Sequence, residues 1–479
     1  MKDKGLDTNR PPRVVVSGYY GFRNLGDEAV LLAMLEAFKS QWAQRRTGRR
    51  DGTLQVVVLS NDSGQTRRLY GVEAVNRWHI KEIYRVLREA DLLISGGGSL
   101  LQDVTGIKSL LYYLGVMWLA VQLKKPVVFY AQGIGPVRTA LGRFLVRRVA
   151  NRARLIIVRD EQSARDLARM GVDGPPVHVT VDAALGLCGE KIDGGRGAEI
   201  LRQFGVSTGG RNGEGCPGTA SGAGERCPQA ASDGIGEAVN VTDRKHPETG
   251  AGAHGSGHPE AGRAPEIRNN RYSCAKDASR SVTGTGQLFP TSHLPHPTSQ
   301  IAGISVRNWP GFTDRKKRAV ARVADGLVRQ GWQVVFLPFH YPADVAVGRD
   351  IAARMEKPAP VLERDFTVEE MISVIRCLDL LIGMRLHALI LAAILNVPLV
   401  GISYDPKIDR FLQQLDLRPA ARVGDPDFGK LDGAVEEILK DPEGFKKKLG
   451  EKIKPLQKLA HRSAVLALDV LEEVRNSTC

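Results

Sequence analysis

Short runs of β-branched and other apolar residues alternate with helical segments along most of this chain, and this alternation strongly limits the folds open to it. In the first half the apolar runs lie at 14–16, 56–59, 92–94, 127–130, 155–158 and 177–181. Segments with apolar residues at three- and four-residue spacing separate them, such as 29–38 and 140–150. Strands that are apolar on both faces and separated by helices are typical of a parallel, doubly wound sheet. We therefore expect a Rossmann-like domain over residues 13–185.

The alternation stops in the segment 207–300, which is rich in Gly, Ser, Ala, Pro and His and has few bulky apolar residues. Such a segment cannot bury enough apolar surface to offset the entropy that it would lose on ordering. We expect a disordered insertion here. The alternative is a small metal-binding module held by Cys216, Cys227, Cys274 and nearby histidines.

The alternation resumes after this segment, with apolar runs at 301–306, 334–337, 380–382 and 397–402. Helical candidates lie between them at 315–329, 368–377 and 386–395. The pattern predicts a second doubly wound, Rossmann-like domain over 301–440. We expect part of the basic, helical tail at 441–479 to cross back and pack on the first domain. Two such domains facing each other across a cleft form a GT-B-like arrangement, in which ligands bind at the carboxyl ends of strands.

The charge of the chain indicates an anionic ligand. The 479 residues have a formal net charge of +14, and acidic and basic residues roughly cancel within the insertion. Most of the positive charge therefore belongs to the two folded domains. An anionic small substrate, an anionic membrane surface and a nucleic acid are all compatible with it, and composition alone does not choose among them.

Several features of the sequence predict a cytoplasmic protein. The six cysteines are scattered rather than paired as in structural zinc sites, and the first residues lack the apolar region of a secretory signal. The longest apolar run, at 110–121, is shorter than a membrane-spanning helix requires. We interpret it as a buried helix, with contact to a lipid surface as the alternative.

The first predicted strand runs directly into a loop and a helix, in the segment GYYGFRNLGDE at 18–28. The glycines allow a sharp turn, and either Asn24 or Asp27 can cap the helix. One interpretation is a purely structural strand-to-helix turn. The functional interpretation places Asp27 in the cleft, with Asn24 beside it, as a base or as a carboxylate that binds a hydroxyl group.

Two further loops follow neighbouring strands and contain glycine. In the first, Gly96, Gly97 and Gly98 can expose backbone N–H groups at the start of a helix, where anions are favoured. This loop has neither the lysine of a Walker A loop nor the spacing of a dinucleotide fingerprint, and a close-packed turn is the alternative. The second loop, 131–136, carries the polar side chain of Gln132. Two open strand ends at one edge of a sheet favour a binding site there.

Cationic side chains follow three strands of the second half. Arg307 comes after the run at 301–306, and a guanidinium at that place suits bidentate binding of a carboxylate or phosphate. Arg385 and His387 lie where another strand passes into an apolar helix, and Lys407 follows the next strand. A single histidine is often a structural residue, but the nearby arginine and the helix N-terminus favour a role in anion binding or catalysis. We expect these four side chains to converge on one anion.

At these residues the sequence resembles the polysaccharide pyruvyltransferase family, most closely its CsaB-type branch from bacterial cell-wall biosynthesis. The motifs that carry the resemblance are GYYGFRNLGDEA, ISGGGSLLQD followed by SLLYYLGVMWLA, YAQGIGP, VRDEQSARDL, ISVRNW, MRLHALILA and ISYDPKI. They occur in the order of the family and extend over most of the chain outside the insertion and the first dozen residues. The insertion departs from the compact pattern of the family and leaves the spacing of the two domains open.

The resemblance implies a GT-B-like fold and transfer of a pyruvyl group from phosphoenolpyruvate. The implied acceptor is a sugar such as N-acetylmannosamine in a lipid-diphosphate-linked disaccharide, on which a 4,6-ketal forms. Pyruvylated wall polymers of this kind anchor S-layer proteins. His387 matches the candidate general acid of the family, and Arg307 and Lys407 match its donor-binding cations. Asp27 and Arg159 occupy other polar motif positions.

Two rival functions remain open at this stage. One is a GT-B glycosyltransferase that uses a nucleotide sugar, because a fold does not determine a reaction. The other is a noncatalytic basic scaffold for lipid or nucleic acid, although aromatic residues make up only 6% and no nucleic-acid-binding motif occurs. We expect no nucleic acid partner, no metal and no cofactor besides the donor substrate. A basic surface and a lipid-linked acceptor are compatible with peripheral attachment to the inner face of the membrane.

Overall fold

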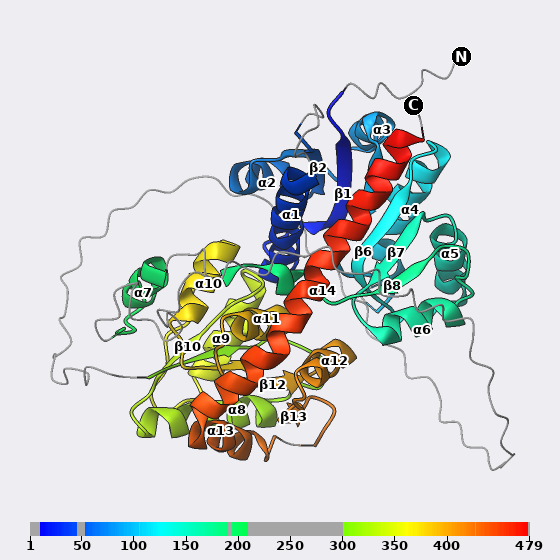
Figure 1. Cartoon of the computed structure of the whole chain (residues 1–479). Helices are drawn as coiled ribbons and strands as arrows, with labels where there is room; N and C mark the ends of the chain where they lie inside the picture. Colours follow the sequence, from blue (N-terminus) through cyan, green and yellow to red (C-terminus); the bar gives the residue numbers. More distant parts are fainter. Residues whose placement is uncertain are drawn as a thin grey trace, which may run out of the picture. The chain divides into compact units, whose positions relative to one another are not determined.

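The first half of the chain forms a parallel sheet with the strand order β3-β2-β1-β4-β6-β7-β8, in which β5 pairs with β6 (Figure 1). The computed structural model describes residues 10–45, 53–104, 106–189, 194–208, 300–426 and 428–477. The strands are β1 (Arg13–Tyr20), β2 (Gln55–Ser60), β3 (Glu73–Asn76), β4 (Leu92–Ser95), β5 (Gly98–Leu101), β6 (Val127–Ile134), β7 (Leu155–Val158) and β8 (Val177–Val179). All residues of β4, β6 and β7 are buried, as expected for strands covered on both faces.

Helices connect these strands. They are α1 (Leu25–Arg45), α2 (Ser63–Tyr70), α3 (Ile80–Glu89), α4 (Ile107–Gln122), α5 (Ala140–Ala150) and α6 (Glu161–Arg169), followed by the 3-10 turn η1 (Ala183–Gly186) and α7 (Gly194–Gln203). The apolar run at 110–121 lies in α4, which buries one face but leaves Leu111 exposed. Among the described residues, no helix is long and apolar enough to cross a membrane.

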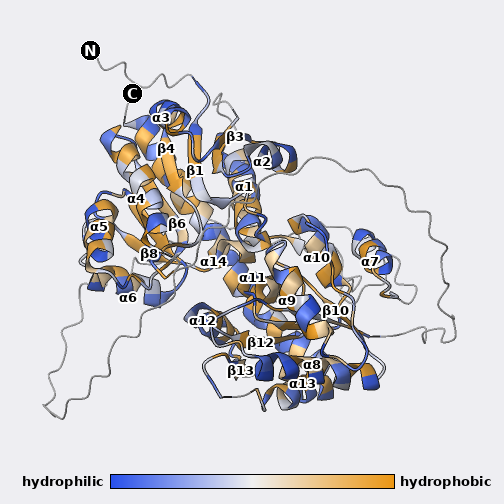
Figure 2. Cartoon of the chain, turned by 180° about the vertical axis from the view of Figure 1, so that it is seen from behind, coloured by the Kyte–Doolittle hydropathy of each residue, from blue (hydrophilic) through white to orange (hydrophobic). Residues whose placement is uncertain are grey.

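The second half forms a smaller parallel sheet with the strand order β10-β9-β11-β12-β13. Its strands are β9 (Ile301–Ser305), β10 (Gln333–Phe336), β11 (Leu380–Gly383), β12 (Leu399–Ser403) and β13 (Ala421–Arg422). Its helices are α8 (Asp314–Arg329), α9 (Ala343–Ala352), α10 (Val368–Arg376), α11 (Leu386–Ile394), α12 (Pro406–Gln414) and α13 (Leu431–Lys440). Figure 2 shows that the strands of both sheets are mainly apolar, in agreement with the runs of apolar residues in the sequence.

The last helix, α14 (Pro442–Asn476), returns to the first sheet (Figure 1, red). Arg45 of α1 donates a hydrogen bond to Asp469 at 2.6 Å, and Ser463 donates one to Thr180 at 3.0 Å. Arg475 lies 3.3 Å from the buried carboxylate of Asp91. Both sheets thus belong to one compact unit of the chain.

The strand order of each sheet reverses at one place. In the first sheet the reversal falls between β1 and β4, and in the second between β9 and β11. Loops diverge at such a switch point, which leaves an open crevice at the carboxyl ends of the two strands. Asp27 follows β1, Arg307 follows β9, and Arg385 and His387 follow β11.

The structure corrects the prediction for the three consecutive glycines. They do not begin a helix: Gly98 starts the short strand β5, which pairs with β6 through Gly98 and Gln132, and α4 starts only at Ile107. The predicted disordered insertion and the alternative cysteine and histidine module at 207–300 lie outside the described residues, apart from 207, 208 and 300.

Candidate functional site

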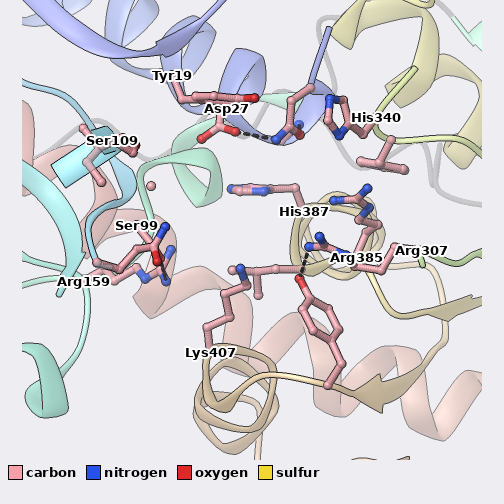
Figure 3. A pocket seen from close by; sticks show the side chains of 18 of the residues that line it. Tyr19, Asp27, Ser99, Ser109, Arg159, Arg307, His340, Arg385, His387 and Lys407 are labelled. Carbon is pink, nitrogen blue, oxygen red and sulfur yellow. Dashed lines mark hydrogen bonds between the residues drawn. The ribbon is translucent and has the colours of Figure 1, made fainter. Parts of the chain in front are cut away.

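A pocket of about 350 Å³ lies where loops from the two sheets meet (Figure 3). Its lining includes eight of the eleven site residues predicted from the sequence. These are Asn24, Asp27, Gly98, Arg159, Arg307, Arg385, His387 and Lys407. Backbone bonds join the two halves beside it, because Leu25 N donates to Phe339 O at 2.8 Å and Tyr341 N donates to Arg23 O at 3.1 Å.

Asp27 lies in the first turn of α1 and faces the pocket. The side-chain amide of Asn24 donates to Asp27 Oδ2 at 2.6 Å, and its oxygen accepts from Gly26 N at 3.2 Å. Burial raises the pKa of Asp27 to about 6, although the charges of His387 and Lys407 oppose this rise. A carboxylate of this kind can accept a proton from a sugar hydroxyl near neutral pH.

Arg307 presents a guanidinium to the pocket without a carboxylate partner among the described residues. Its Nη1 donates to the hydroxyl of Tyr404 at 2.9 Å, and its Cζ lies 4.8 Å from the ring centroids of Trp309 and Tyr404. Two aromatic rings and one hydrogen bond therefore fix the orientation of this cation but do not neutralise it. Such a cation is well suited to bind an anionic ligand.

Lys407 lies in the first turn of α12, 3.9 Å from Asp405 Oδ2, so this ion pair is loose. Its Nζ lies 5.6 Å from the ring centroid of Tyr404. Burial alone would raise the pKa of Tyr404, but the charges of Lys407, Arg307 and Arg385 lower it below its ordinary value. The lowered pKa reflects a positive potential on this side of the pocket.

Two other arginines of the pocket already face buried carboxylates. Arg385 donates from Nε to Asp344 Oδ2 at 2.8 Å and from Nη2 to Asp344 Oδ1. Arg159 donates from Nη1 to Asp182 at 3.0 Å and from Nη2 to Ser99 at 2.9 Å. These ion pairs hold the pocket together and reduce the positive charge that the two guanidinium groups offer to a ligand.

His387 lies near the centre of the pocket in Figure 3, between Asp27 and the cations of the second half. Its Nε2 lies 3.7 Å from Asp182 Oδ1, which is too long for a direct hydrogen bond but close enough for an ion pair. Burial would raise the pKa of Asp182, yet His387 and Arg159 lower it well below its ordinary value. Asp182 therefore stays ionised beside the imidazole.

Gly26 passes close to the other side of the imidazole. A β-carbon on Gly26 would lie 2.2 Å from His387 Nδ1, so only glycine leaves room for the ring in this position. The first turn of α1, in the first half of the chain, thus determines the space that is left for the side chain of His387 in the second half.

The remaining three predicted site residues support the pocket from behind rather than line it. Gln132 is fully buried, and its amide donates to Ser95 Oγ and to Gly96 O, both at 2.7 Å. A β-carbon on Gly96 would meet the Tyr20 hydroxyl at 2.2 Å, and one on Gly97 would meet Val30 at 2.6 Å. These two glycines permit close packing, which was the alternative interpretation of the loop.

Several polar residues of the pocket were not predicted from the sequence. Tyr19, Ser99, Ser109 and His340 line it, and Asp182 contacts His387 from below the surface. Asp182 and His340 both follow predicted strands, at 177–181 and 334–337, so their places after the carboxyl ends of these strands could have indicated them. Burial lowers the pKa of His340, and the charges of Arg385 and Arg307 add to this effect. Among the described residues, no group of three or more His, Cys, Asp or Glu could hold a metal ion.

The two doubly wound sheets and the pocket between their loops define a two-domain α/β protein with a cationic pocket at the facing switch points of its sheets. The chain belongs to the polysaccharide pyruvyl transferase family, whose model matches residues 24–212 and 283–406, more than half of the sequence. It is therefore a transferase of polysaccharide biosynthesis. The match contains all the predicted site residues except Lys407, which follows its last residue.

Solved structures with a similar fold have little sequence in common with this chain. One is a putative UDP-N-acetylglucosamine 2-epimerase from Listeria monocytogenes, with 11% identity, a TM-score of 0.52 and 97% coverage of each chain. Another is UDP-GlcNAc 2-epimerase from Neisseria meningitidis, with 10% identity, a TM-score of 0.51 and coverage of 96% of this chain and 100% of that chain. These likenesses confirm the predicted fold class of two Rossmann-like domains in a GT-B-like arrangement. No curated protein matches the sequence.

Proposed function

We propose that this protein transfers a pyruvyl group from phosphoenolpyruvate to two hydroxyls of a sugar and so forms a ketal. The observation that carries the proposal is that His387 lies in one pocket with two cations that are not neutralised by a close carboxylate. Arg307 has no carboxylate partner among the described residues, and the ion pair of Lys407 with Asp405 is long, at 3.9 Å. Phosphoenolpyruvate has a carboxylate and a phosphate on one enol carbon, so its site requires several cations and a proton donor. Membership of the pyruvyl transferase family supports the same donor.

The donor would be held by its two anionic groups. Arg307 has a planar guanidinium that matches a carboxylate or phosphate, while Lys407 provides a compact positive charge in the first turn of α12. The N-termini of α11 and α12 add positive potential at the same edge of the second sheet. These groups act by positioning the donor and stabilising its charge.

His387 would act as the general acid. Protonated His387 gives its proton to the methylene carbon of the enol, and the resulting positive character at the central carbon is attacked by a sugar hydroxyl. The C–O bond to phosphate then breaks, and the second hydroxyl attacks the same carbon to close the ketal. One of the two hydroxyl protons restores the proton that His387 gave up, and the other leaves with the phosphate.

Asp27 would first accept the hydroxyl proton that finally leaves with the phosphate, and would pass it on to that phosphate, so that Asp27 is ionised again after each turnover. Its pKa of about 6 lets it be mostly ionised at neutral pH and still accept a proton when a hydroxyl approaches. Asn24 orients the carboxylate through its bond of 2.6 Å to Oδ2.

The proposed acceptor is N-acetylmannosamine in a lipid-diphosphate-linked precursor of a cell-wall polymer, as in the CsaB-type branch. The reaction would then take place at the cytoplasmic face of the membrane, and the ketal-bearing polymer would anchor S-layer proteins. The exposed cations of the first domain support such a location, because they complement anionic lipid.

The test is to offer the purified protein either phosphoenolpyruvate or a series of nucleotide sugars, each with the lipid-linked disaccharide. The proposal predicts that phosphoenolpyruvate is consumed only when acceptor is present, with one phosphate released for each ketal detected by mass spectrometry. Consumption of a nucleotide sugar with phosphoenolpyruvate left intact would instead establish a glycosyltransferase.

A further inference from the structure

The first domain has a concentration of exposed apolar side chains on neighbouring helices. Among the described residues, eight large apolar side chains are 41% to 67% exposed, and seven of them lie on α3, α4, α5 or the segments that lead into these helices. We refer to these seven as the α3–α5 surface. They are Trp78, Ile80, Tyr84, Val104, Leu111, Leu141 and Phe144.

The elements that carry this surface are joined by direct contacts. The ring of Trp78, just before α3, lies 5.6 Å from the ring of Tyr112 on α4. Asp103 accepts hydrogen bonds from the backbone N–H groups of Arg138 and Thr139 at 2.9 and 2.8 Å, so the segment before α4 is tied to the segment before α5. A β-carbon on Gly142 of α5 would lie 3.1 Å from Leu110 of α4. The exposed side chains therefore lie on elements that are in direct contact with one another.

The same segments are strongly basic. Residues 78–89, 104–111 and 137–148 contain eight Lys and Arg but only two acidic residues, Glu82 and Glu89. None of the eight cations forms an ion pair with a described residue. They are all exposed: Lys81, Arg85, Arg88, Lys108, Arg138, Arg143, Arg147 and Arg148.

This combination favours an anionic lipid bilayer over a protein or nucleic acid. Apolar side chains among cations can enter the boundary between headgroups and acyl chains while the cations bind lipid phosphates. Tryptophan and tyrosine are enriched at that depth of a membrane. A second copy of this chain would bring like charges together across the contact, which opposes self-association. A nucleic acid would complement the charge but would leave the aliphatic side chains without a partner.

The surface also adjoins the pocket. Gln102 and Ser109 line the pocket, whereas Val104 and Leu111, each two residues farther along the chain, are exposed. Two exposed apolar side chains of the surface thus come from the same part of the chain as two residues that line the pocket.

We propose that the α3–α5 surface docks the protein on anionic phospholipid bilayers and so presents the mouth of the pocket to a lipid-linked acceptor. The part of this proposal that concerns the acceptor rests on the proposed function. The docking itself does not, because it depends only on the exposed residues and their charges.

The test measures co-sedimentation of the full chain with vesicles of phosphatidylcholine alone and of equal parts of phosphatidylcholine and phosphatidylglycerol. The intact protein is expected to bind the anionic vesicles, and salt should weaken the binding. The double variant Leu141→Ser and Phe144→Ser should bind roughly tenfold more weakly. Lys108→Glu should weaken binding about fivefold or more. Leu69→Ser is the matched control, because Leu69 on α2 is the one exposed apolar side chain of the eight outside the surface.

Phe144→Trp keeps an aromatic side chain suited to the membrane interface, so this variant should retain binding. The proposal is overturned if the intact protein does not co-sediment with anionic vesicles, or if Leu69→Ser loses as much binding as the double variant. It is also overturned if the double variant instead dissociates a dimer in sedimentation analysis, since the surface is then a protein interface. Turnover of a lipid-free acceptor is measured separately, so a failure of pyruvyl transfer cannot be mistaken for a failure of docking.

Discussion

His387 Nε2 lies 3.7 Å from Asp182 Oδ1, so the candidate acid and a buried carboxylate approach each other from opposite halves of the chain. Asp182 also accepts from Arg159 Nη1 at 3.0 Å and from Ala184 N at 3.1 Å. Its negative charge faces the imidazole at the place where the proposed reaction requires a proton donor.

Asp182→Asn should therefore reduce kcat roughly tenfold to a hundredfold, because the neutral amide no longer places a negative charge beside the ring that donates the proton. The KM for phosphoenolpyruvate should change much less, since Asp182 does not line the pocket. Steady-state kinetics separates these two effects. Asp325→Asn, at another buried aspartate outside the pocket, is the control. A fall in stability with unchanged kcat would show that Asp182 has only a structural role.

Gly26→Ala adds a single methyl group beside His387 and so tests whether the observed position of the imidazole is required for activity. The new β-carbon would lie 2.2 Å from His387 Nδ1, and the imidazole is the part that can move. We expect the protein to fold, because alanine is favourable in a helix, while turnover falls about a hundredfold. Gly115→Ala on α4 is the control, because nothing lies within 4 Å of its β-carbon. Full activity of Gly26→Ala would mean that the ring need not stay where it is observed.

Arg307→Lys keeps the charge but removes the planar fork. Lysine cannot both bond to the hydroxyl of Tyr404 and present two parallel donors to an anion. We expect the KM for phosphoenolpyruvate to rise about tenfold or more. Arg329→Lys, at an exposed arginine paired with Glu356, should leave the kinetics unchanged. If both variants behave like the intact enzyme, Arg307 does not bind the donor.

Glu28 provides a test of pH-dependent stability. It is buried beneath the loop, accepts from Gly21 N and Tyr70 OH at 2.7 Å each, and burial raises its pKa to about 7. The folded protein therefore holds a proton that the unfolded chain releases near the ordinary pKa of glutamate, so stability falls as the pH rises towards 7 and levels off above it.

Glu28→Gln removes this titration while its amide can satisfy both partners. Between pH 5 and pH 8, the free energy of unfolding of the intact protein should fall by roughly 2 kcal/mol relative to that of the variant. Urea unfolding at the two pH values measures the difference. Asp27, with its pKa raised to about 6, affects the stability mainly at lower pH, and it does so in both proteins. An equal stability difference at pH 5 and pH 8 would contradict the account.

The fold was largely predictable because its strands are encoded locally. The β-branched runs at 14–16 and 155–158 are buried on both faces of a parallel sheet, and that burial is what the sequence pattern reflects. Strand β5 could not be predicted in this way. Its Gly98 and Ser99 have low strand propensity, and the strand exists because the segment pairs with β6.

The candidate site was predictable in part, for a different reason. Parallel strands bring their carboxyl ends to one edge, so Arg307, His387 and Lys407 could be placed together without a structure. The ion pairs of Arg385 with Asp344 and of Arg159 with Asp182 could not be predicted, because no periodic pattern links these partners. The catalytic and binding roles of the site residues stay predictions.

The most direct test of the central claim is to measure donor binding and turnover side by side for His387→Gln. Glutamine keeps a polar side chain of similar reach but cannot deliver a proton to carbon, while Arg307 and Lys407 remain in place. The account predicts that the Kd for phosphoenolpyruvate stays within a few fold and that turnover falls at least about a hundredfold. Turnover that survives within a few fold of the intact enzyme would contradict the assignment of His387 as the acid.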